Sequence, residues 1–111
     1  MASQNVLTLD STSFDQEISK KGSGPLLVDF WAEWCGPCRL MGPVIDKVAT
    51  RFKGTARVGK VDVDEHQALA ARYGVLSIPT LLLFKDGQVV EQLVGTTSED
   101  NLARLIERHS S

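Results

Sequence analysis

Residues 34 to 38 read WCGPC, and this stretch contains both cysteines of the 111-residue chain. Two thiols at this spacing could exchange with disulfides, form a stabilising disulfide or supply half of a metal site. A disulfide closing so small a loop adds only about 2 kcal/mol. A zinc site usually needs two more Cys or His ligands, and only His66 and His109 remain, far apart in the sequence. We therefore expect redox chemistry and no bound metal.

A helix is predicted to begin at this motif, because apolar residues recur after it at helical spacing. These residues are Leu40, Met41, Val44, Ile45, Val48, Ala49 and Phe52. The helix should run for about four turns, with a kink at Gly42-Pro43. At its start, unpaired N–H groups and the helix dipole would stabilise an accessible Cys35 thiolate, with Cys38 one turn further inside. Cys35 would attack a substrate disulfide, and Cys38 would release the product by closing a Cys35–Cys38 disulfide.

Asp29 lies within the apolar run Leu26 to Trp31, which is typical of a strand covered on both faces. A buried carboxylate needs compensation, and burial would raise its pKa, so Asp29 is a candidate proton carrier for Cys38. Lys60, in the next parallel-type strand, is a candidate partner for its charge. In the alternative interpretation, Asp29 points to solvent at a strand end and Lys60 is simply exposed.

The remaining pattern predicts a mixed α/β fold. Strand-like runs cover Val6 to Leu9 and the region of Val58 to Val63, and Asp86-Gly87 between two apolar runs predicts a hairpin. Helices are expected from Ser13, whose spacing to Gln16 fits a capping box, to about Gly22; over Glu65 to Tyr73; and after Thr97 to Asp100. The order is β-α-β-α-β followed by α-β-β-α. It indicates parallel pairs plus an antiparallel hairpin, with helices on both faces of the sheet.

Composition narrows the class of protein. The chain has 42% hydrophobic and 23% charged residues and a net charge of −2, so it is expected to be one globular domain over residues 1–111. Without excess positive charge it is not expected to bind nucleic acid. No apolar run is long enough to span a bilayer, and residues 1–20 lack the apolar core of a secretory signal. We therefore expect a cytoplasmic protein, acting as a monomer.

Two segments of the sequence resemble the thioredoxin family, and the similarity extends over nearly the whole chain. Residues 28–38, VDFWAEWCGPC, resemble the active-site segment, and Tyr73-Gly74-Val75 followed by Ile78-Pro79-Thr80 resembles the second signature. From the sequence alone, a cis bond before Pro79 would be the less frequent outcome. The resemblance instead implies a cis-proline facing the cysteines, with Cys38 as the buried thiol, Asp29 as the acid that assists proton transfer and Lys60 as its neighbour.

The resemblance also implies a thioredoxin fold, with a central mixed sheet between helices, and a groove for protein substrates. The implied groove residues are Trp34, Gly36, Pro37, Ser77, Ile78, Pro79, Gly95 and Thr96. The implied function is general protein-disulfide reduction, in electron transport and cell redox homeostasis, without a bound cofactor. The implied partners are disulfide-containing proteins and a thioredoxin reductase, either flavin-dependent or ferredoxin-linked. Leu76-Ser77 and Thr96 depart from the commonest family pattern and leave the choice of partner open.

Two other functions are compatible with the same motif. An oxidase or isomerase would use a less reducing cysteine pair on the same scaffold, although Gly-Pro between the cysteines resembles reductases more closely. A redox-independent binding module or assembly subunit would use the apolar face around the motif without turnover. Reduction of a model protein disulfide, compared with a variant lacking both thiols, separates the module from the enzyme.

Overall fold

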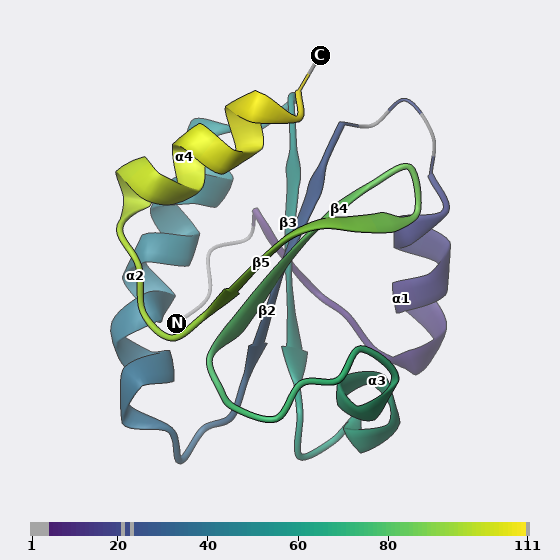
Figure 1. Cartoon of the computed structure of the whole chain (residues 1–111), viewed down its shortest axis with the longest axis vertical. Coiled ribbons are helices and arrows are strands. Elements are labelled where there is room, and N and C mark those ends of the chain that lie inside the picture. The colour runs from purple at the N-terminus through teal and green to yellow at the C-terminus, as the bar shows by residue number, and fades with distance from the viewer. Residues whose placement is uncertain (1–4, 21, 23, 111) are drawn as a thin grey trace.

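The computed structural model describes residues 5–20, 22 and 24–110. Within these residues the chain forms five strands and four helices in the predicted order (Figure 1). The strands are β1 (Val6–Thr8), β2 (Leu26–Trp31), β3 (Arg57–Asp62), β4 (Thr80–Lys85) and β5 (Gln88–Val94). The helices are α1 (Ser11–Ile18), α2 (Gly36–Arg51), α3 (Gln67–Arg72) and α4 (Glu99–Arg108).

The strands form one mixed sheet in the order β1-β3-β2-β4-β5. Strand β3 pairs in parallel with β1 and β2, whereas β4 pairs antiparallel with β2 and β5. The predicted hairpin is confirmed: Asp86 (φ 52°) and Gly87 (φ 84°) both adopt the left-handed conformation between β4 and β5. Parallel strands β2 and β3 end at the same edge of the sheet, where the segments that follow them are brought together.

Helices cover both faces of the sheet, with α2 and α4 on one side and α1 and α3 on the other (Figure 1). Each side has its own core. Leu27 and Leu81 of the central strands pack with α2 and α4, and Val28 and Leu82 pack with α1 and α3. Because side chains alternate along a strand, Asp29 shares the face of Leu27 and therefore points toward α2.

The first helix begins earlier than predicted. Asp10, not Ser13, is the N-cap, and its carboxylate accepts hydrogen bonds from the N–H groups of Thr12 and Ser13. Ser13 occupies the third helical position, and its hydroxyl oxygen accepts a hydrogen bond from the Asp10 N–H, at 2.9 Å. The observed capping box, Asp10 with Ser13, thus lies three residues before the predicted one, Ser13 with Gln16. The spacing within the two pairs is the same.

Other helix boundaries differ from the predictions by a few residues. Helix α1 ends at Ile18 rather than near Gly22, and α3 covers Gln67–Arg72 rather than Glu65 to Tyr73. Helix α2 has the predicted four turns and continues through Pro43 without interruption. In the part of the chain that the structure describes, none of the helices has the length and apolar character that crossing a membrane requires.

Candidate active site

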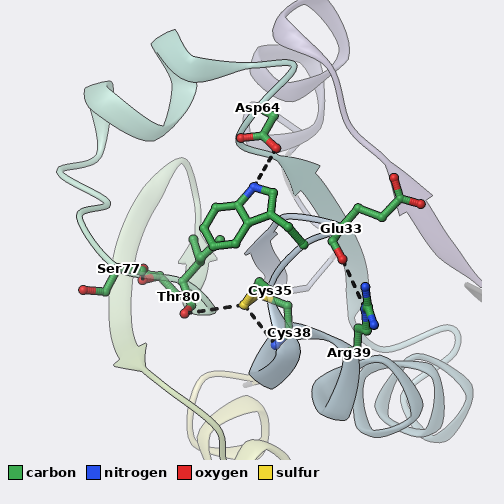
Figure 2. Close-up of a disulfide and its surroundings, with 9 residues drawn as sticks. Glu33, Cys35, Cys38, Arg39, Asp64, Ser77 and Thr80 are labelled. Carbon is green, nitrogen blue, oxygen red and sulfur yellow. Dashed lines mark hydrogen bonds between the residues drawn. A yellow bond between two sulfur atoms is a disulfide. The ribbon is translucent and has the colours of Figure 1, made fainter.

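Cys35 and Cys38 meet at the start of α2, where they form a disulfide with a Cα–Cα distance of 5.2 Å (Figure 2). Cys35 is the N-cap residue, and its Sγ accepts a hydrogen bond from the Cys38 N–H at 3.2 Å. Pro37 lies in the first turn, where its missing N–H leaves no helical hydrogen bond unmade. The geometry therefore directs a backbone donor and the positive end of the helix dipole at the Cys35 sulfur.

Both cysteines are shielded in this oxidised form. Each is only 4% exposed, and they pack with Ala32 against Trp31 and Ile78. The expected contrast between an accessible Cys35 and a buried Cys38 is not seen in the residue exposures of this oxidised form. The two cysteines differ in hydrogen bonding, because Cys35 is the N-cap residue and its sulfur accepts a hydrogen bond from the Cys38 N–H.

Asp29 is fully enclosed in the central strand β2. Its side chain is 1% exposed, which rules out the solvent-facing interpretation. Neither carboxylate oxygen has a hydrogen-bonding partner among the described residues. Burial raises the pKa of Asp29 to about 7, and the positive charge of Lys60 opposes that rise. Asp29 is therefore a carboxyl group that can gain and lose a proton near neutral pH.

Lys60 is the neighbour of Asp29 across the β2–β3 pair, in parallel register. Its Nζ lies 4.9 Å from the centroid of the Trp31 ring, in a cation–π contact. Lys60, Trp31 and Cys38 also line a cavity of about 670 Å³, together with polar groups from the ends of β1 and β3. Solvent in this cavity can thus approach Cys38.

The second signature segment closes the other side of the disulfide. The Ile78–Pro79 bond is cis, as the family resemblance implied. The carbonyl oxygen of Ile78 lies 3.8 Å from the Cys35 Sγ, and the Pro79 carbonyl accepts a hydrogen bond from the Gly95 N–H at 2.8 Å. Because β4 begins only at Thr80, the proline displaces no ladder hydrogen bond within a strand.

The predicted groove residues differ in how far they are exposed. The exposed ones are Trp34, Gly36, Pro37, Ser77 and Thr96, whereas Ile78 and Gly95 are half-buried and Pro79 is buried. Two features were not predicted: the Trp34 indole donates a hydrogen bond to Asp64, and Leu76 is 97% exposed beside Ser77. Asp64 stands in the acidic run Asp62 to Glu65, where no sequence signal distinguishes one acid from the next.

Residues 5–20, 22 and 24–110 contain no candidate metal centre. In that part of the chain, no three side chains of His, Cys, Asp or Glu cluster so that they could hold an ion. At the start of α2 the structure brings together the two sulfurs, the Cys38 N–H and the Ile78 carbonyl.

Comparison with known proteins agrees with this geometry. The family model "Thioredoxin" matches residues 5–108. A thioredoxin from Staphylococcus aureus is 46% identical over 104 residues, covering 94% of this chain and 97% of the relative. Among solved structures, a point mutant of thioredoxin from Halobacterium salinarum NRC-1 superposes with a TM-score of 0.87 at 43% identity, covering 100% of this chain and 96% of that one.

A more distant structural neighbour gives the same fold. It is a chain from a study of the thiol resolving mechanism in yeast mitochondrial 1-Cys peroxiredoxin via glutathione/thioredoxin systems, with a TM-score of 0.83 and 30% identity. The match covers 97% of this chain and 99% of that chain. The family indicates disulfide-containing substrates and a thioredoxin reductase as partners. With its CxxC pair joined at the start of α2, the chain belongs to the thioredoxin family and is a thiol–disulfide oxidoreductase that reduces protein disulfides.

Proposed function

We propose that Cys35 is the attacking thiol of this reductase and Cys38 the resolving thiol. The Cys35 thiolate attacks one sulfur of a substrate disulfide, that S–S bond breaks, and the other substrate sulfur leaves as a thiolate and takes up a proton. Cys38 then loses its proton and attacks the Cys35 sulfur. The second substrate sulfur leaves, the Cys35–Cys38 disulfide forms, and the substrate has gained two electrons. The single observation that supports this assignment is the N-cap position of the Cys35 sulfur.

Asp29 is the proposed acceptor of the Cys38 proton. Its buried carboxyl group has a pKa of about 7, so its ionised and protonated forms are both populated at neutral pH. Lys60, its neighbour in the sheet, favours the ionised form that can accept a proton. Transfer would pass directly or through solvent in the cavity that Cys38 and Lys60 both line.

Substrates would bind across the groove made by Trp34, Gly36, Pro37, Ser77, Ile78, Pro79, Gly95 and Thr96. Support comes from Ile78, whose carbonyl lies 3.8 Å from the Cys35 sulfur, and from the exposed Trp34 side chain. A polypeptide placed against Ile78 and Trp34 would hold its disulfide next to the nucleophile.

In the cell, we expect the chain to act as a single-domain monomer in the cytoplasm on a range of protein disulfides. Its disulfide would be re-reduced by either a flavin-dependent or a ferredoxin-linked thioredoxin reductase. No bound cofactor takes part in the proposed steps, because the two cysteines exchange both electrons themselves. Reduction assays with each class of reductase would identify the partner.

Trapping of the mixed disulfide tests the division of roles. The Cys38→Ser variant should accumulate a covalent adduct with an oxidised protein substrate through Cys35, and mass spectrometry would identify the joined cysteine. The Cys35→Ser variant is the matched control and should form far less adduct. If Cys35→Ser trapped substrate as well as Cys38→Ser does, the roles would be wrong. Substrate binding that survived replacement of both cysteines, without reduction by the wild type, would instead indicate a binding module.

A further inference from the structure

The large aromatic ring of Trp34 stands beside the disulfide with 68% of its surface exposed. Its indole N–H donates a hydrogen bond to the Asp64 carboxylate, with a distance of 2.9 Å from Nε1 to Oδ2 (Figure 2). An exposed side chain with two rotatable bonds would otherwise sample several rotamers. The contact with Asp64 therefore selects one orientation of the ring.

Asp64 is itself fixed to the sheet. Its backbone N–H donates a hydrogen bond to Asp62 Oδ1 at 2.9 Å, and Asp62 ends β3 opposite Trp31 of β2. Trp34 follows β2 and Asp64 follows β3, and the two parallel strands end at the same edge. The acceptor for the indole is thus held by a short turn whose hydrogen bond uses the backbone of Asp64, leaving its carboxylate for Trp34.

We propose that Asp64 is a positioning residue that holds Trp34 as a preformed wall of the substrate groove. This inference rests on the proposed function, in which Trp34 contacts polypeptide substrates. A ring already held in its binding orientation loses less rotamer freedom when a substrate chain packs on it, so binding is tighter. Small disulfides that reach the sulfurs without touching the indole gain nothing. Asp64 therefore favours protein disulfides over small ones through KM, with little effect on kcat.

A competing role for Asp64 would be electrostatic, because a nearby carboxylate could also act on the Cys35 thiolate. The two roles predict different effects of Asp64→Asn. Asparagine is neutral but keeps an oxygen that can accept the indole N–H, so the positioning role survives and an electrostatic role is lost. Asp64→Ala removes both the negative charge and the acceptor for the indole N–H, while the backbone hydrogen bond to Asp62 remains possible. Glu65→Ala is the charge-matched control, because Glu65 is an exposed neighbouring acid.

The experiment is a double-mutant cycle with Trp34→Phe, which keeps an aromatic ring but has no N–H. With a protein disulfide as substrate, Asp64→Ala and Trp34→Phe should each raise KM by roughly three- to tenfold, and the double variant should raise it no further. Asp64→Asn should restore KM to near the wild-type value. The redox potential and the rate with a small aliphatic disulfide should stay unchanged in the Asp64 variants. In ¹⁵N NMR spectra, Asp64→Ala should shift the Trp34 indole N–H signal, and Glu65→Ala should leave it in place.

Each other outcome contradicts the proposal in a distinguishable way. If the effects of Asp64→Ala and Trp34→Phe multiplied in the double variant, Asp64 would act on something other than the indole. If Asp64→Asn behaved like Asp64→Ala and both changed the redox potential, the electrostatic role would replace the positioning role. If Trp34→Ala left KM for the protein unchanged, the assignment of Trp34 to the groove would fail, and this inference with it.

Discussion

Asp29 and Glu91 lie on the same face of the sheet but in opposite electrostatic environments. Asp29, in the central strand β2, has no hydrogen-bonding partner among the described residues, and burial raises its pKa to about 7. Glu91 lies in the edge strand β5. Its carboxylate is hydrogen-bonded to His109 Nε2 at 2.8 Å and accepts a hydrogen bond from Arg108 Nη1 at 3.0 Å. The hydrogen bond with His109, and then the charge of Arg108, lower the pKa of Glu91.

The difference separates a carboxylate that stabilises the fold from one whose ionisation opposes it. Glu91 holds the end of α4 against the sheet, and Lys85 assists by donating to the His109 carbonyl at 2.9 Å. Asp29 anchors nothing in the described part of the chain and should weaken the fold when it ionises. A proton carrier for Cys38, as proposed above, would be one use for an acid at the centre of an otherwise apolar sheet.

The largest predicted effect is on the pH dependence of stability. The pKa of Asp29 is raised on folding. Its contribution to the unfolding free energy is therefore fully present below the unfolded pKa of about 4 and is lost as pH rises through about 7. This difference corresponds to about 4 kcal/mol of unfolding free energy lost between pH 4 and pH 8. Asp29→Asn should lack this loss, measured by urea unfolding of the oxidised protein across that range. Parallel curves for the two proteins would contradict the buried, unpartnered state of Asp29.

The next effect is kinetic. If Asp29 accepts the Cys38 proton, Asp29→Asn should slow release of the mixed disulfide by roughly 10- to 100-fold at pH 7. In the wild type the release rate should increase as pH rises through the pKa of Asp29, and the variant should lack that inflection. Single-turnover measurements with a labelled substrate would follow the step directly, and Glu91→Gln is the control. An identical pH profile in Asp29→Asn would remove Asp29 from the mechanism.

The smallest effect concerns the edge strand. Glu91→Gln should lower the unfolding free energy by up to about 1 kcal/mol near pH 7, because the contacts of Glu91 with Arg108 and His109 are partly exposed. Since the pKa of Glu91 is lowered on folding, this stabilisation is present above its unfolded pKa and is lost as pH falls through the folded value. The gap between variant and wild type should therefore close in acid. If the difference in unfolding free energy between Glu91→Gln and wild type instead widened below pH 4, the lowered pKa of Glu91 would be contradicted.

Periodicity and turn residues were sufficient to predict most of the fold. The apolar run around Asp29, the helical spacing after Cys38 and the Asp86-Gly87 turn each specify an element from neighbouring residues alone. The predicted start of α1 was wrong because Asp10 and Ser13 form the capping box, with Ser13 at the position where Glu or Gln is usual. The order of helices and strands along the chain could be predicted as well, whereas the order of the strands within the sheet was not predicted.

The site could be predicted only where local chemistry defines it. The cysteine pair is a local motif. The apolar neighbours of Asp29 favoured its burial but left a solvent-facing position open, and the structure shows that it is buried. The contact between Trp34 and Asp64 depends on the register of β2 against β3, which the sequence does not specify. The cis bond before Pro79 also needed the family resemblance, because a proline alone does not determine the isomer.

Competitive alkylation of the reduced protein tests the central claim that Cys35 is the activated thiol. Iodoacetamide labelling over a range of pH, read by mass spectrometry, would report each thiol separately. We expect Cys35 to react first, with a midpoint clearly below the ordinary thiol pKa of about 8.5, while Cys38 reacts slowly. Equal and slow labelling of both cysteines near neutral pH, or faster labelling of Cys38, would contradict this account.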